Sequence, residues 1–203
     1  MKKDGSLVRL KVPPKFFGGA ILVKDGVAWH LTGDSGQDQV MWRPDTGEVK
    51  ATGVNSFILS AIQDGSKVWL AGNDGAENGL HRLPDGFRKT GSAHYVARIA
   101  GTLYGALNNE IYKLGSSGAS RVIALPVKEV QQMADYKGVI IAACSGPDSI
   151  WAISGSKKKM LAEAKDDGQT GSLFDNVVLV DGDDIWWGRA EGTRFVLERL
   201  VVK

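Results

Sequence analysis

The chain has 203 residues, of which 43% are hydrophobic, so it can bury the core of one large domain or of two small ones. Its formal net charge of +2 lacks the basic excess of a general nucleic-acid-binding protein, and a nucleic acid is not an expected partner. A single cysteine excludes an internal disulfide, and no apolar run approaches the roughly 18 residues that cross a membrane.

The first unit of the chain sets a pattern of short strands separated by turns. Its expected strands cover residues 20–23, 27–31, 40–43 and 48–50. Asp25-Gly26 joins the first two strands, since this dipeptide tolerates the positive φ of a two-residue hairpin loop. A polar loop over 33–39 joins the next two, and Pro44-Asp45-Thr46-Gly47 makes the last turn. The unit is therefore an antiparallel meander.

Four later units repeat this order at a regular spacing. Large side chains recur at one place in the second strand, with a mean step of about 39 residues: Trp29, Trp69, Tyr104, Ile140 and Trp186. A second series falls in the third strand: Trp42, His81, Tyr112 and Trp151. A period of about 40 residues with four strands per repeat is typical of a β-propeller, where such side chains fill the space between neighbouring blades.

The units predict an all-β, five-bladed β-propeller of four-stranded antiparallel blades, in a single domain over residues 1–203. The expected blades cover about 18–53, 54–91, 92–126, 127–169 and 170–203, the last together with 1–13. The fifth unit lacks a fourth strand, so we expect an N-terminal strand over residues 7–12 to complete it, which closes the ring and removes two sheet edges. Residues 125–134 also fit a short helix, but the period favours a crossover loop that leads into an inner strand.

Two stretches, residues 68–86 and residues 42–49, resemble blades of the two-component-regulator-propeller and virginiamycin-B-lyase-like type. Val68-Trp69-Leu70, followed by Gly79 to Gly86 with its Pro84-Asp85-Gly86 turn, is similar to a strand and turn of those blades. Residues 42–49 are similar to their turn ending in Thr-Gly-Glu-Val. The resemblance covers the first two units well and the rest through the period, and it implies an architecture and not an activity. Lyases of that type have a histidine-centred, metal-assisted site, and this sequence has no matching histidine motif.

Groups that carry catalysis are sparse. His30 falls in a second strand, His81 in a third strand and His94 in a connection between blades. Packing between blades or exposure at the surface accounts for a histidine at each of these places. No nucleophile elbow and no phosphate-binding loop occur. Asp175 is the clearest acid at an inner strand, with Glu129 and Asp135 as weaker candidates. We therefore predict no catalytic residue, no metal site and no cofactor.

The two ends of the predicted propeller differ in their loops. First-to-second and third-to-fourth strand turns share one end and are tight, as at Asp25-Gly26. Second-to-third strand loops and connections between blades share the other end and carry acids, amides and aromatic side chains: Phe16, Asp34, Asp38, Asn55, Asp74, Glu77, His94, Tyr95, Gln131, Gln132 and Asp175. Because loops longer than a turn requires commonly carry binding residues, we expect this second end to contact a partner.

A basic rim is expected at the end with the tight turns. The run Lys157-Lys158-Lys159 falls in the third-to-fourth strand turn of the fourth blade, and ring closure brings the equivalent turn of the fifth blade beside it, with Lys2, Lys3 and Lys203. Such a rim is either a solvated turn or a docking surface for an anionic partner.

These features favour a non-enzymatic binding or structural propeller that engages a protein partner, in the cytoplasm or within a larger particle such as a phage virion. One alternative is a carbohydrate-binding, lectin-like propeller, which near-identical pockets in every blade would support. Another is a lyase or glycoside hydrolase with a site at the mouth of the channel. A membrane is not an expected partner, and the N-terminal residues lack the apolar core of a classical signal peptide.

Overall fold

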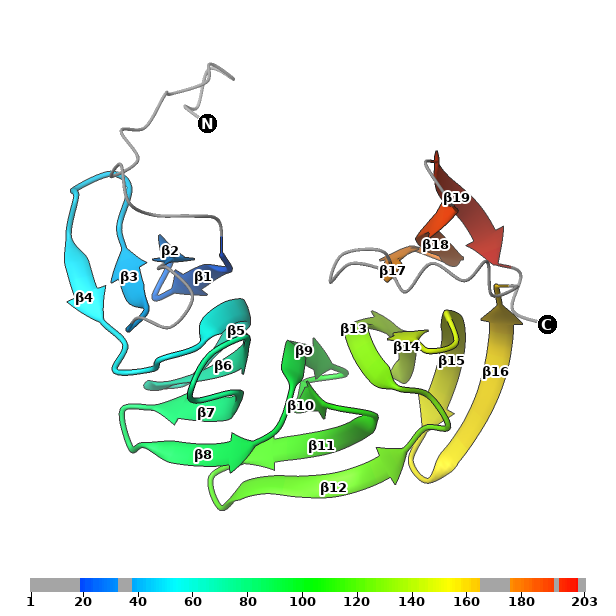
Figure 1. Cartoon of the computed structure of the whole chain (residues 1–203), viewed down its shortest axis with the longest axis horizontal. Coiled ribbons are helices and arrows are strands. Elements are labelled where there is room, and N and C mark those ends of the chain that lie inside the picture. The colour runs from blue at the N-terminus through cyan, green and yellow to red at the C-terminus, as the bar shows by residue number, and fades with distance from the viewer. Residues whose placement is uncertain (1–18, 33–37, 165–175, 192–193, 201–203) are drawn as a thin grey trace.

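The computed structural model describes residues 19–32, 38–164, 176–191 and 194–200. These residues form strands without any helix, grouped into five antiparallel sheets that follow one another around a common centre (Figure 1). Four sheets have four strands and the last has three. The structure therefore confirms the predicted all-β fold with the five sheets of a five-bladed propeller.

The strands follow one another in chain order within each sheet. The first sheet contains β1 (Ile21–Lys24), β2 (Val27–Thr32), β3 (Val40–Trp42) and β4 (Val49–Ala51), and the second contains β5 (Phe57–Asp64), β6 (Lys67–Asn73), β7 (Gly79–Leu83) and β8 (Phe87–Thr90). The third contains β9 (Ala93–Ile99), β10 (Thr102–Leu107), β11 (Glu110–Gly115) and β12 (Gly118–Ala124). The fourth contains β13 (Glu129–Tyr136), β14 (Val139–Ser145), β15 (Ser149–Ser154) and β16 (Lys157–Glu163), and the last contains β17 (Asn176–Asp181), β18 (Asp184–Glu191) and β19 (Arg194–Leu200).

The first two strands of each sheet are joined by a two-residue hairpin turn. At the first hairpin Asp25 and Gly26 have φ of 52° and 74°, which is the left-handed geometry that matches the twist of the flanking strands. Lys137 and Gly138 repeat this geometry in the fourth sheet, with φ of 52° and 84°. Because the turns have the same length, they set the same register in each sheet.

Neighbouring sheets pack face to face, and one apolar cluster fills each of the four junctions. We call the face toward the next sheet in chain order the front face, and the face toward the preceding sheet the rear face. Trp69 on the front face of the second sheet shares a buried cluster with Tyr112 on the rear face of the third. Trp69 of the second-strand series and Tyr112 of the third-strand series thus fill one junction from opposite sides.

One member of the predicted second-strand series was wrong by one residue. Ile140 lies on the rear face of the fourth sheet, whereas Ile141 lies at the junction with the last sheet. The hairpin closes with Tyr136 paired to Val139, so the position equivalent to Trp69 is Ile141. Alternation along the strand makes a shift of one residue a change of face.

The inner strands of neighbouring sheets are linked by side chains. The Ser60 hydroxyl lies 3.2 Å from both the amide nitrogen and the carbonyl oxygen of Val96. The Gln132 side-chain oxygen accepts a 2.7 Å hydrogen bond from the Val178 amide. These bonds join β5 to β9 and β13 to β17 across junctions where no backbone ladder forms between the described strands. The strand preferred over a helix near residue 130 is present as β13.

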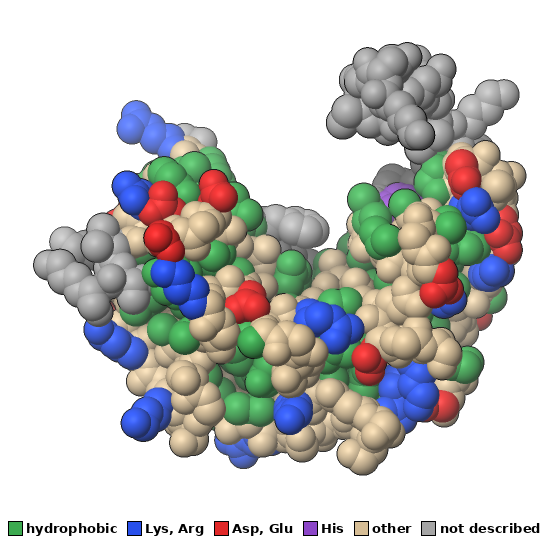
Figure 2. Space-filling model, turned by 180° about the vertical axis from the view of Figure 1, so that it is seen from behind, with side chains coloured by type: hydrophobic (Ala, Val, Ile, Leu, Met, Phe, Trp, Pro, Cys, Tyr) green, Lys and Arg blue, Asp and Glu red, His purple; other side chains and the backbone are tan. Residues whose placement is uncertain are grey.

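The first and last sheets stand on opposite sides of an opening in the ring (Figures 1 and 2). Ile21 of β1 is 70% exposed and Leu179 of β17 is 63% exposed, so neither inner strand is covered there. The predicted strand over residues 7–12, which would complete the last sheet, lies outside the described residues.

Candidate functional site

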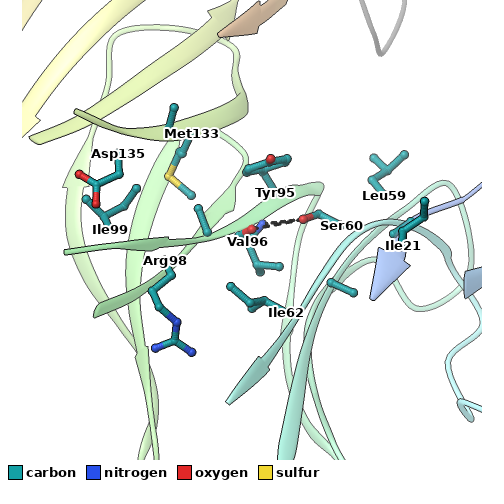
Figure 3. Close-up of a pocket in the computed structure, with 14 residues that line it drawn as sticks. Ile21, Leu59, Ser60, Ile62, Tyr95, Val96, Arg98, Ile99, Met133 and Asp135 are labelled. Atoms are coloured by element: carbon teal, nitrogen blue, oxygen red, sulfur yellow. Dashed lines mark hydrogen bonds between the residues drawn. The ribbon is translucent and has the colours of Figure 1, made fainter. Parts of the chain in front are cut away.

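The inner strands enclose a hollow of about 430 Å³ at the centre of the arc (Figure 3). Its lining comes from β1, β5, β9 and β13. Figure 3 shows Tyr95 between Met133 of β13 and Leu59 of β5, with Ile21 beyond Leu59. Most residues around the hollow are apolar by type, but several of them are buried, and the surface open to the hollow is more polar than apolar.

The charged residues beside the hollow are engaged in the fold. Arg98 donates to the backbone oxygens of Gln63 and Gly101, each at 3.0 Å. Asp135 accepts hydrogen bonds from the amides of Ala100 and Gly138, at 2.7 and 2.8 Å. Both side chains thus stabilise hairpin turns, and Asp135 is not positioned as one of a pair of catalytic acids.

A polar cluster around His94 lies at the opposite end of the inner strands. His94 of β9 is buried, and its Nε2 lies 3.0 Å from the Ser92 hydroxyl and 3.4 Å from a carboxylate oxygen of Glu129. The Asn73 amide nitrogen is 3.5 Å from the same atom. Residues of the second, third and fourth sheets therefore meet at one imidazole nitrogen.

The geometry of this cluster does not suit a hydrolase triad. In a triad the nucleophile and the acid contact opposite ring nitrogens, so that the ring transfers a proton between defined positions. Here the Ser92 hydroxyl and the Glu129 carboxylate both lie at Nε2. Burial lowers the pKa of His94 below its ordinary value of 6.5, and this outweighs the opposing effect of Glu129. The imidazole is therefore neutral at neutral pH and links three sheets.

Several residues expected in connections between blades lie within strands instead. His94 and Tyr95 belong to β9, and Gln131 and Gln132 belong to β13. Each strand continues past a β-bulge, which takes up one extra residue and hides the alternation on which the strand limits were predicted. Tyr95 lines the hollow, and Gln132 bonds the last sheet.

The other predicted binding residues at the loop end differ in their surroundings. The Gln131 side-chain oxygen is buried and has no hydrogen-bond partner among the described residues. Asn55 and Glu77 bond each other through the Asn55 amide and the Glu77 carboxylate at 2.9 Å, and through the Glu77 amide and the Asn55 carbonyl at 2.9 Å. Asp38 and Asp74 are exposed. The remaining predicted residues lie outside the described part of the chain: Phe16, Asp34 and Asp175.

The predicted basic rim is partly described. Lys157, Lys158 and Lys159 are exposed, but they form the start of β16 and the turn before them is Gly155-Ser156, so their placement in the turn was wrong. The hairpin ladder simply begins earlier, with Lys157 paired to Ser154. Alternation then sends neighbouring lysines to opposite faces, and Lys158 donates to the Ala124 carbonyl at 2.8 Å. Lys2, Lys3 and Lys203 lie outside the described residues.

Two residues of the site had weak sequence signals. Ser60 interrupts the apolar stretch of β5, and this interruption marks the bond to Val96. Ser92 lies two residues before His94, a spacing without a recognisable motif. Within the described ranges, no group of three or more His, Cys, Asp or Glu side chains is arranged to hold a metal ion. None of the described segments is a helix long and apolar enough to cross a membrane.

Comparisons with known proteins identify the fold but no close relative. No family model matches the chain, and no curated protein sequence is detectably similar to it. Among solved structures, the extracellular domain of BT4673 from B. thetaiotaomicron, described as a hybrid two-component system, aligns with a TM-score of 0.64 at 13% identity. The alignment covers 95% of this chain and 28% of that chain. The chain is a β-propeller.

Two further propellers show the same likeness. Oligogalacturonate lyase in complex with manganese aligns with a TM-score of 0.58 at 12% identity, over 95% of this chain and 67% of the lyase. BamB from Moraxella catarrhalis aligns with a TM-score of 0.52 at 16% identity, over 91% of this chain and 70% of BamB. At such low identity the likeness concerns the fold of this propeller and not its activity.

Proposed function

We propose that this propeller is a non-enzymatic binding module that engages a protein partner through the hollow between its inner strands. The observation that carries the proposal is the hollow of about 430 Å³ that β1, β5, β9 and β13 line at the centre of the molecule. Its size falls in the range of roughly 300–1,000 Å³ that is usual for binding pockets. The same role suits a subunit of a larger assembly, such as a virion.

The engagement of the polar side chains beside the hollow favours a protein segment over a small polar ligand. Pockets for polar ligands need a few polar groups that are available to fix the ligand's orientation. Here Ser60, Arg98 and Asp135 bond the surrounding backbone. Leu59 and Tyr95 are half-buried and offer side-chain surface that an inserted apolar side chain can cover, whereas Met133 is buried beneath them.

The position of the hollow favours approach from the hairpin-turn end. Its lining extends along β9 from Tyr95 to Ile99, and Ile99 pairs with Thr102 at the hairpin turn. At the loop end the buried His94 and its neighbours bond one another. The binding surface predicted from the sequence, at the loop end, is the competing prediction.

Site-specific photo-cross-linking in the native source tests the proposal. A photoreactive phenylalanine analogue at Tyr95 reports on the hollow, one at Asp74 reports on the loop end, and one at Asp45 is a control on an outer turn. We expect a discrete cross-linked protein from Tyr95. Leu59→Lys places a charge in the lining and should abolish this cross-link, whereas Met160→Lys, at an exposed apolar residue outside the hollow, should retain it. Cross-linking from Asp74 alone would overturn the proposal in favour of the loop end.

A further inference from the structure

The strands that supply most of the lining each present one edge to the hollow. β5, β9 and β13 are end strands of their sheets, so each has a ladder partner along one edge and none along the other among the described strands. Along an antiparallel pair, the main-chain groups of successive residues point alternately toward the partner strand and away from it. Every second residue of these strands therefore directs its N–H and C=O groups toward the inside of the arc (Figure 1).

Two contacts between sheets show which residues point inward. The amide and the carbonyl of Val96 both lie 3.2 Å from the Ser60 hydroxyl, so the main chain of Val96 points away from β10, its ladder partner. The Val178 amide donates to the Gln132 side chain at 2.7 Å, away from β18. Both valines stand three residues before the residue that closes the hairpin of their strand. By alternation, the residues one and three positions before this closing residue direct their main-chain groups inward.

This register applies to all three strands around the hollow. It is confirmed on β5, where the inward carbonyl of Gln63 accepts a 3.0 Å hydrogen bond from Arg98 of the next sheet. Four other residues of the lining have inward main-chain groups that bond no described residue: Ala61, Arg98, Met133 and Asp135. The inner edges thus offer the hollow a set of donors and acceptors that belong to the main chain.

The side chains at these positions leave the main chain as the available polar group. The Asp135 carboxylate accepts hydrogen bonds from the amides of Ala100 and Gly138, at 2.7 and 2.8 Å. Ala61 has no polar side chain. At Ala61 and Asp135, the groups that a ligand can bond are therefore N–H and C=O groups.

The edge of β5 is the most accessible of the three. On β9 the Ser60 hydroxyl already contacts both inward groups of Val96. On β13 the inward residue Met133 is buried. On β5 the inward residue Ala61 is half-buried and lies two residues from the half-buried Leu59, which also lines the hollow (Figure 3). A ligand can therefore reach the main chain of β5 at Ala61.

An extended polypeptide is the ligand that matches such an edge. A strand carries one donor and one acceptor on each residue and points them to the same side at every second residue, which is the spacing of the inward groups. Addition of a strand to an open edge takes its affinity from main-chain hydrogen bonds. The lining of β9 from Tyr95 to Ile99 extends for about 17 Å, at about 3.3 Å per residue, so a segment of about five residues matches its length.

We propose that the partner segment enters the hollow as an extended strand and pairs with the inner edge of β5 through the N–H and C=O groups of Ala61. This inference rests on the proposed function, because it names the form in which the same hollow recognises a protein. The main chain of the segment supplies the affinity, and its side chains contact Leu59 and Tyr95.

A pair of synthetic peptides tests the proposal on the whole chain. The probe is a blocked pentapeptide of alternating threonine and valine, which are residues that favour an extended conformation. Titration followed by amide NMR shifts should give saturable changes at Ala61 and Gln63. The same peptide with every amide nitrogen methylated retains the side chains but has no donors, and it should bind about tenfold more weakly or less. Equal binding of the two peptides, or no saturable change at these amides, would overturn the proposal.

Two substitutions at Ala61 locate the contact. Ala61→Pro removes one inward N–H, and proline is compatible with an edge strand where that group lies outside the ladder. It should weaken binding of the unmethylated peptide about fivefold, which corresponds to one neutral hydrogen bond. Ala61→Val adds similar bulk but retains the N–H, and it should bind like the original chain. Equal losses in the two variants would overturn the pairing at β5. Should Ala61→Pro fail to fold, the comparison of the two peptides decides by itself.

The outcomes also separate this proposal from the proposed function. A discrete cross-link from Tyr95 together with equal binding of the two peptides would retain the protein partner and overturn recognition through the main chain. Binding of the unmethylated peptide without any cross-link from Tyr95 would support the pairing at β5 and count against the protein partner.

Discussion

Arg82 should be among the most stabilising side chains of this propeller. Its side chain is 8% exposed, and Nη1 donates to the carbonyls of Gly115 and Ser116 in the next sheet at 2.5 and 2.9 Å. The guanidinium also lies 5.2 Å from the ring centre of Trp69 and 5.3 Å from that of Phe87. One cation thus joins the second sheet to a turn of the third while it stacks on two rings.

Replacement of Arg82 by Met keeps much of the apolar stem but leaves both carbonyls without this donor. Hydrogen bonds from a charged group contribute about 1.5–3 kcal/mol each. Two such bonds at the lower value contribute about 3 kcal/mol, and the contact of the cation with the two rings adds about 1 kcal/mol. The substitution should therefore lower the free energy of unfolding by about 4 kcal/mol. Urea unfolding followed by circular dichroism measures this loss. Arg121→Met is the matched control, because its ion pair with Glu110 is exposed and should contribute about 0–1 kcal/mol. Equal effects of the two substitutions would refute the argument.

Two smaller predictions concern the inner strands. Ser60→Ala removes the hydrogen bonds to Val96 and should lower the free energy of unfolding by about 1 kcal/mol or more. Ser120→Ala, at an exposed hydroxyl, is the control and should be nearly neutral. Indistinguishable urea midpoints of the two variants would count against a stabilising contact between Ser60 and Val96. Burial holds the pKa of His94 below 6.5, so the unfolded chain binds a proton more readily, and stability should fall as the pH drops from about 6.5 through the lower folded pKa. His94→Gln should reduce this loss of stability at low pH without abolishing it, because burial also lowers the pKa of His81. Thermal unfolding followed across pH measures the effect, and an unchanged pH profile in the variant would contradict this account.

The repeat and the hairpins could be predicted because they depend on local chemistry. Asp25-Gly26 specifies a tight turn by itself, and the recurrence of large residues such as Trp29 and Trp69 reports the period. The error at Ile140 arose because the sequence shows an apolar run there, without the alternation that would reveal the face.

The candidate site was less predictable because it depends on bulges and on contacts between sheets. The bulge between Val130 and Gln132 places Gln131 and Gln132 within β13, whereas the sequence assigned them to the connection that leads into this strand. The burial of His94 results from three sheets meeting, which no short segment encodes. The hollow likewise depends on how four inner strands are spaced, and its lining residues are ordinary strand residues.

The reactivity of Cys144 reports how often the junction around it opens. It is the single cysteine of the chain and is completely buried on β14, in the cluster between the third and fourth sheets. Burial raises the pKa of its thiol, which keeps the reactive thiolate scarce while the fold is intact. A thiol-specific dye added to the native protein should therefore react at a rate set by how often this junction separates. The labelling rate at increasing urea concentrations would then reveal whether the fourth sheet opens alone or only when the whole propeller unfolds.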